Sequence, residues 1–138
     1  MGAGAGGQPA ASAQHRENLR RRDGLERFWR HVIGGAAAAR FHRPGSGLGL
    51  SQPAVATIQA ARKLESLIKL WDIEPANELL SDREDNEAYL AAQPGRAYAL
   101  YFTDGGAVGL DLKHAPGRFG VRWIDIGSGE WGQSERLD

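Results

Sequence analysis

The hydrophobic pattern of this chain changes period once, and this change limits the folds that the chain can adopt. Over residues 23–33 and 51–73, apolar residues recur every three or four positions, which is the period of an amphipathic helix. From residue 88 they alternate with polar residues, as in strands with one buried face. Helices followed by a run of strands favour an α+β fold, with N-terminal helices and then a small antiparallel, sandwich-like sheet.

Residues 23–33 are the first segment with clear helical spacing. Asp23 and Glu26 match a capping box, so we expect the helix to begin there, with an upstream extension over residues 15–23 as the alternative. The Gly-Gly pair that follows should end it. The basic run at 20–22 is typical of a solvated helix face. Downstream, the alanine-rich run 36–42 leads to a proline and predicts a short buried strand, which a glycine-rich loop follows.

The clearest helix is predicted over residues 51–73. Ser51 supplies an N-cap oxygen, and Pro53 lies in the first turn, where its missing N–H costs nothing. The apolar stripe of this helix needs a partner surface, and the other predicted elements offer few helices that could cover it. We therefore expect the chain to self-associate through this uncovered helix. The stripe consists of Ala54, Ile58, Ala61, Leu64, Ile68 and Trp71.

The C-terminal half contains four predicted strands, over residues 88–93, 97–103, 107–112 and 118–126. A Pro-Gly-Arg turn joins the first two. The Asp-Gly-Gly stretch at 104–106 joins the second to the third as a tight hairpin, because glycine adopts positive φ at no steric cost. Trp123 lies in the apolar register of these strands, so we expect it in the core. Tyr101 and Trp131 fall outside that register, so we expect both to be exposed.

Composition argues against several classes of protein. The 17 basic residues equal the 17 acidic ones, whereas phosphate binding needs a basic excess, so we expect no nucleic-acid partner. Cysteine is absent and the four histidines lack zinc-site spacing, so no metal is expected. The glycine-rich stretches lack the nucleotide-binding fingerprints, so we expect no cofactor. No apolar run approaches the roughly 20 residues that cross a bilayer, so no membrane partner is expected.

The change of period also divides the chain into regions. We expect the Gly/Ala-rich residues 1–14 to be a disordered tail, because such a sequence has little to bury when it is ordered. Residues 15–74 form the helical region and residues 75–138 the β region. Each of these two is short for an independent core, which indicates a part of a larger unit. The start lacks the pattern of a signal peptide, and the localisation is left open.

Residues from about 25 to 138 resemble the C-terminal end of a bacterial glycoside-hydrolase-like family. The stretches that carry the resemblance are RFWRHVIGGAAAARFHRP, IKLWDIEPANELL, YALYFTDGGAVGLDL and VRWIDIGSGEW. In that family a (β/α) barrel is followed by a small β-sandwich that bears the name collagen-binding domain of a collagenase. The resemblance implies that residues 15–74 are the end of a barrel, with 36–42 as its last strand, and that 75–138 are the sandwich. It is also compatible with a secreted parent protein.

The candidate binding residues follow from this assignment. Active sites of such barrels lie at the C-terminal ends of the strands, where Arg40, His42 and Arg43 fall; a structural salt bridge is the alternative that we prefer for them. Exposed aromatic rings stack on sugars, which makes Tyr101 and Trp131 the candidates in the β region; packing within the sheet is the alternative that we prefer for them.

Catalysis in a glycoside hydrolase needs two carboxyl groups across one cleft. The acidic residues at 82–87 lie in a polar linker, and we expect them to be solvated. The catalytic carboxylates of related glycosidases come from earlier barrel strands that no residue here matches, so we assign no catalytic residue.

The sequence therefore predicts a non-catalytic C-terminal accessory module that binds a polysaccharide or another extracellular polymer such as collagen. Two alternatives stay open. One is a small carbohydrate-active hydrolase that uses His42 and a carboxylate such as Glu74. The other is a structural domain that closes a barrel supplied elsewhere.

Overall fold

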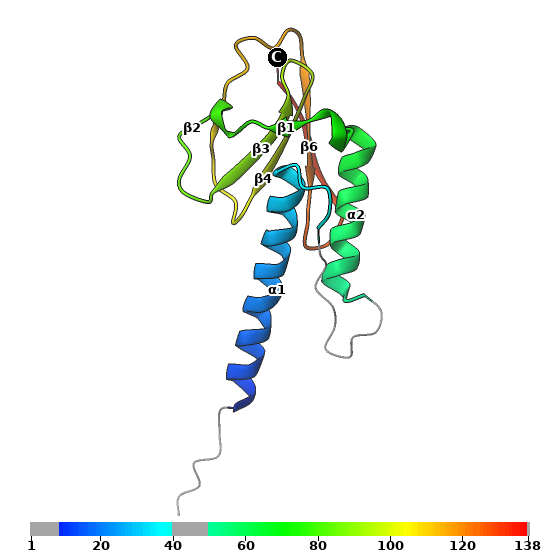
Figure 1. The fold of residues 1–138 in the computed structure, drawn as a ribbon, viewed down its shortest axis with the longest axis vertical. Helices are drawn as coiled ribbons and strands as arrows, with labels where there is room; N and C mark the ends of the chain where they lie inside the picture. Colours follow the sequence, from blue (N-terminus) through cyan, green and yellow to red (C-terminus); the bar gives the residue numbers. More distant parts are fainter. Residues whose placement is uncertain (1–8, 40–49, 138) are drawn as a thin grey trace, which may run out of the picture.

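The computed structural model describes residues 9–39 and 50–137. This described part has an α+β fold, in which two helices precede short antiparallel strands (Figure 1). The helices are α1 (Pro9–Ile33) and α2 (Gln52–Leu67), and two single 3-10 turns follow, η1 (Leu70–Asp72) and η2 (Asn77–Leu79). The fold class expected from the change of period is confirmed.

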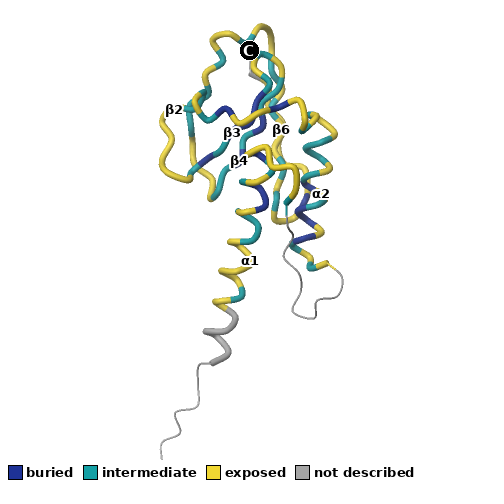
Figure 2. Tube along the Cα trace, viewed as in Figure 1, coloured by how far each residue is buried: buried dark blue, intermediate teal, exposed yellow. Residues whose placement is uncertain are grey.

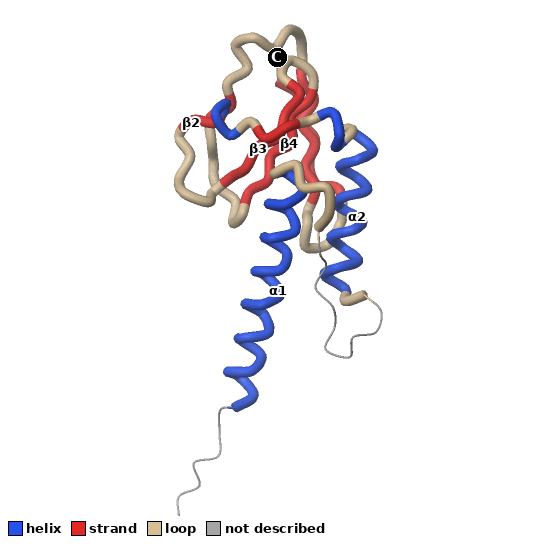
Figure 3. The backbone as a smooth tube through the Cα atoms, viewed as in Figure 1, coloured by secondary structure: helices blue, strands red, loops and turns tan. Residues whose placement is uncertain are grey.

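The strands of the described residues form three antiparallel sheets, which Figure 3 shows above and beside the helices. No ladder of hydrogen bonds joins one sheet to another in this part of the chain. The first sheet has the order β1-β3-β4, the second pairs β2 with β5, and the third is the ribbon β6–β7. Their bounds are β1 (Glu74–Pro75), β2 (Leu80–Ser81), β3 (Ala88–Gln93), β4 (Ala97–Phe102), β5 (Gly109–Leu110), β6 (Phe119–Ile124) and β7 (Trp131–Leu137).

The hairpin β3–β4 agrees with the sequence prediction. β3 covers the predicted residues 88–93, and β4 ends one residue before the predicted limit. The Pro-Gly-Arg turn joins them, and the backbone N–H of Arg96 donates to the carbonyl of Gln93 over 2.9 Å. Alternating apolar residues and a turn sequence were sufficient here because the two strands are neighbours in the chain.

The predicted pairing of the later strands is wrong. The Asp-Gly-Gly stretch does not form a hairpin between the second and third strands, because β5 is two residues long and pairs with β2. Instead, Asp104 forms an ion pair with Arg22 of α1, and the Glu87 carboxylate accepts a hydrogen bond from the Ala107 N–H over 3.1 Å. β6 pairs with β7, a polar strand whose sequence has no clear alternation of its own.

Helix α1 begins well before the predicted start at Asp23. Asp23 is not a cap but forms an ion pair with Arg27 over 2.8 Å, and Glu26 likewise pairs with Arg30 over 2.7 Å. Acidic residues at these positions can therefore pair with arginines one helical turn further on. Such pairs stabilise a helix that continues in both directions, so they do not mark its start. The residues at 9–14, expected to be disordered, are helical, and residues 1–8 of that tail lie outside the described part.

The end of α1 was predicted correctly, but the strand after it was not. Gly35 takes a positive φ of 74°, and the N–H of Gly34 donates to the carbonyl of Arg30 over 2.8 Å. Residues 36–39 form no strand, and their alanine side chains are largely exposed. An alanine side chain has little apolar surface, so its burial would stabilise a strand only weakly. The remaining residues of that predicted strand, 40–42, lie outside the described residues.

Helix α2 has the predicted N-terminus and a covered inner face. The Ser51 hydroxyl accepts a hydrogen bond from the Ala54 N–H over 3.4 Å, as expected of an N-cap. The helix ends at Leu67, before the predicted limit of 73. The expectation that nothing in the chain covers this helix is wrong, because α2 contacts α1 and β6. Its buried residues are Ala54, Ala56, Thr57 and Ala60.

One core joins the helical half to the β half, as the buried segments of Figure 2 show. Small residues on one face of the first sheet, Ala91 and Ala99, let the end of α1 approach closely. The position near residue 74 therefore does not separate two independent cores. The other face of the sheet packs on a second, smaller cluster around Leu90. The members of the shared core are Phe28, Trp29, Ile33, Ala60, Ile73, Ala91, Ala99 and Tyr101.

Candidate ligand-binding surface

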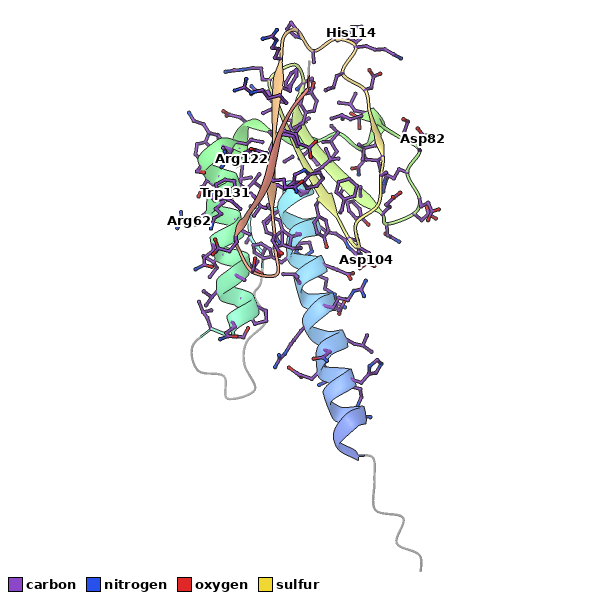
Figure 4. The ribbon with its side chains drawn as sticks, turned by 180° about the vertical axis from the view of Figure 1, so that it is seen from behind. Arg62, Asp82, Asp104, His114, Arg122 and Trp131 are labelled. Atoms are coloured by element: carbon purple, nitrogen blue, oxygen red, sulfur yellow. The ribbon has the colours of Figure 1, made fainter. Side chains whose placement is uncertain are left out.

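Trp131, at the start of β7, is partly exposed and lies beside two cations from different elements. The side chain of Arg122, from β6, has its Cζ 4.6 Å from the centroid of the Trp131 ring. The Nζ of Lys63, from α2, lies 6.0 Å from the same centroid. In Figure 4, Arg62 of α2 lies on this side of the molecule with Arg122 and Trp131. We call Lys63, Arg122 and Trp131 the Trp131 surface.

The turn that leads into β7 holds Trp131 next to α2. Lys63 donates from Nζ to the carbonyl of Gly129 over 2.6 Å. Gly129 has a φ of +76°, and a Cβ there would lie 2.8 Å from the carbonyl oxygen of Ala56, so only glycine lets the turn approach the helix so closely. Asp125 stabilises the turn, since its carboxylate accepts hydrogen bonds from the backbone N–H groups of Gly127 and Ser128 over 2.7 and 3.0 Å.

A bulge in β7 places Trp131 and Arg122 on one face of the ribbon. Ile124 pairs with Trp131, and Arg122 pairs with Ser134, so two steps along β6 correspond to three along β7. An extra residue in one strand of a pair redirects the side chains around it. Without the bulge, the alternation along β7 would separate Trp131 from the face that carries Arg122 and Ser134.

Tyr101 is not an exposed aromatic residue, contrary to the sequence prediction. It is 5% exposed, and its ring stacks between Trp29 and Tyr89, with both centroid distances at 6.3 Å. The prediction failed because both faces of β4 are covered. Tyr101 faces α1, while Leu100 faces the second cluster. Alternation alone identifies two faces of a strand but not whether one of them is free.

Trp123 shows the opposite error. It was expected in the core, yet it is 46% exposed, and its described ring contact is with Phe102 at 6.0 Å between centroids. A second contact, between Tyr98 and Phe119 at 5.7 Å, also joins β4 to β6. The ribbon thus packs on the first sheet through side chains alone, and Trp123 lies at the margin of that contact.

Burial raises the pKa of Tyr101 to about 12, and the negative charge of Glu26 acts in the same direction. In the unfolded chain a tyrosine ionises near pH 10. The folded state therefore retains a proton that the unfolded state loses. We expect the free energy of unfolding to fall as the pH rises from about 10 towards 12. Urea denaturation at several pH values across this range would measure the free energy of unfolding. In Tyr101→Phe this free energy should decrease less over the same range. An equal loss of stability in the variant would contradict this assignment.

The other candidate residues from the sequence do not join Trp131. Arg40, His42 and Arg43 lie outside the described residues. In the acidic segment, Glu87 has a structural partner, because its carboxylate also accepts a hydrogen bond from the Glu84 N–H over 2.9 Å. Glu74 is exposed in the short strand β1. In Figure 4, Asp82 and His114 lie away from the Trp131 surface.

Two further observations concern the described residues as a whole. They contain no group of three or more histidine, aspartate or glutamate side chains that could hold a metal ion. None of the described helices combines the length and the apolar character that a membrane-spanning helix requires.

Sequence reasoning found Trp131 but missed its neighbours. Arg122 had a weak signal, because it falls in the outward register between two apolar residues of a predicted strand. Lys63 had none, because 68 residues separate it from Trp131 and only the packing of the β6–β7 turn on α2 brings them together. Three comparisons with known proteins found no match, neither a family model nor a curated protein nor a solved structure. The family resemblance noted in the sequence therefore stays a prediction.

Proposed function

We propose that this chain is a non-catalytic accessory module of a glycoside-hydrolase-like protein, and that it binds a polysaccharide at the Trp131 surface. The observation that supports this proposal is a partly exposed tryptophan ring, 37% accessible, that two cations and a glycine turn hold in place. The apolar face of a sugar ring packs on an aromatic ring. A ring that is already ordered loses little conformational entropy when the ligand binds.

Trp131→Ala should weaken polysaccharide binding about tenfold, or roughly 1.4 kcal/mol, because the stacking surface is lost. Pull-down by insoluble polysaccharides and by collagen, followed by titration with soluble forms, would measure the effect. Trp71→Ala is the matched control when the parent chain is monomeric at the concentration used, since Trp71 is 72% exposed in η1 and lies outside the Trp131 surface. Equal binding by Trp131→Ala and the parent chain, or binding to collagen alone, would contradict the proposal. Hydrolysis in the same assay would favour the enzyme alternative.

We also propose that the chain self-associates, although through a different surface from the stripe that the sequence suggested. The inner residues of α2 are buried, while Leu67, at its end, is 51% exposed and Trp71, in η1, is 72% exposed. Burying a large apolar side chain contributes roughly 1.5–3 kcal/mol. Sedimentation of the parent and of Trp71→Ala over a range of concentrations tests this, with a shift towards monomer expected in the variant. A parent chain that stays monomeric would exclude it.

A further inference from the structure

The charges around Trp131 carry an inference about the ligand. The chain as a whole has equal numbers of basic and acidic residues, so an excess of cations at this surface does not follow from the overall composition. Arg62 is offset by Glu65 over 3.1 Å, and Lys63 lies 4.0 Å from the exposed carboxylate of Glu130. Arg122 has no carboxylate within 4.0 Å among the described residues, although its side chain is exposed. Its positive charge is therefore accessible to a ligand.

The ladder of the ribbon extends this cationic face along β6 and β7. Gly120 pairs with Arg136, and Arg122 pairs with Ser134, so Arg122 and Arg136 lie on the same face two positions apart. Arg136 is also exposed, and among the described residues it too has no ion-pair partner. The face thus combines one aromatic ring with two arginines whose charge is not offset, and glycine at position 120 leaves open space there.

We propose that the Trp131 surface binds an acidic polysaccharide, in which Trp131 contacts a sugar ring and Arg122 binds a carboxylate of the polymer. This inference rests on the proposed function. A guanidinium forms two parallel hydrogen bonds to a carboxylate, and stacking on an aromatic ring limits its orientations before the ligand arrives. Arg122 on β6 and Arg136 on β7 lie on one face of the ribbon, and two such charges match a polymer that carries a charge on successive sugars.

Proteins that bind single-stranded nucleic acid also combine aromatic rings with arginines, so nucleic acid is the alternative polyanion to consider. Its binding needs neutralisation of many closely spaced phosphates, and proteins that bind it generally have a basic excess. The balance of 17 basic and 17 acidic residues, with a small local excess of cations, favours the more sparsely charged polysaccharide.

The experiment uses the full chain with polygalacturonate and with the same polymer after complete methyl esterification, which removes the charge and keeps the backbone. We expect polygalacturonate to bind about tenfold more tightly at low salt, as one charge-assisted pair would give, and the difference to shrink as salt is added. Arg122→Gln should remove this difference by weakening binding to polygalacturonate more than binding to the ester, whereas Trp131→Ala should weaken binding to both polymers. Arg136→Gln is the second charge variant. Arg96→Gln, in the exposed β3–β4 turn, is the matched control.

The outcomes separate this inference from the proposed function. Equal binding of the two polymers by the parent chain would contradict the preference for an acidic polysaccharide. The proposed polysaccharide-binding function would still stand. Binding of single-stranded oligo-dT as tight as that of polygalacturonate would overturn it in favour of a general polyanion surface. Failure to bind any polysaccharide would overturn both. A denaturation curve for each variant confirms that the comparison is made between folded proteins.

Discussion

Trp29→Ala is expected to lower the free energy of unfolding by about 3–5 kcal/mol, the range for removing a buried large aromatic side chain. Trp29 is 3% exposed and joins the helical half to the sheet. Its ring lies edge-on to Phe28 at 5.4 Å and stacks on Tyr101 at 6.3 Å. Truncation leaves a cavity between α1 and β4, and the surrounding rings can fill it only in part. Because one core serves both halves, we expect a single cooperative transition at lower denaturant concentration.

Urea denaturation followed by far-UV circular dichroism would measure this loss. Trp71→Ala removes the same side chain from a position that is 72% exposed, so it serves as the control and should change stability by less than about 1 kcal/mol. If both substitutions cost the same, Trp29 does not join the two halves. If the helical signal of Trp29→Ala is lost while the sheet stays folded, the two halves fold independently.

Leu90→Ala is expected to lower the free energy of unfolding by about 2–5 kcal/mol. Leu90 is fully buried, at 0% exposure, in the cluster on the other face of the first sheet. Its backbone is held on both sides, because its N–H donates to the Asn77 side chain over 2.8 Å and its carbonyl accepts from the Ala76 N–H over 2.9 Å. A fixed backbone prevents the site from collapsing around the smaller residue, so the cost should lie in the upper part of the range.

The control for Leu90 is Leu67→Ala, which makes the same change at a position that is 51% exposed. We expect this variant to lie within about 0.5 kcal/mol of the parent chain. Thermal unfolding of the two variants side by side tests the difference. Similar melting temperatures for the two would mean that the second cluster contributes little to the stability of the fold.

The binding surface was partly predictable from the sequence. Trp131 lies outside the apolar register of the strands, and that observation was sufficient to expect it to be exposed. The same reasoning failed for Tyr101, because α1 covers the face of β4 that alternation leaves outward. It failed for Trp123 because this residue lies at the margin of the contact between the ribbon and the first sheet, where it is 46% exposed. In each case the error concerns which face has a covering layer.

The sequence by itself determined the local elements of this protein. The N-cap at Ser51, the glycine end of α1 and the hairpin β3–β4 depend on residues a few positions apart, whose preferences act without help from the rest of the chain. Only the tertiary structure decided the pairing of β5 with β2, the sharing of one core by both halves, and the contact of Lys63 with Trp131. These depend on contacts between distant residues, and hydrophobic periodicity specifies that a face is buried without specifying its partner.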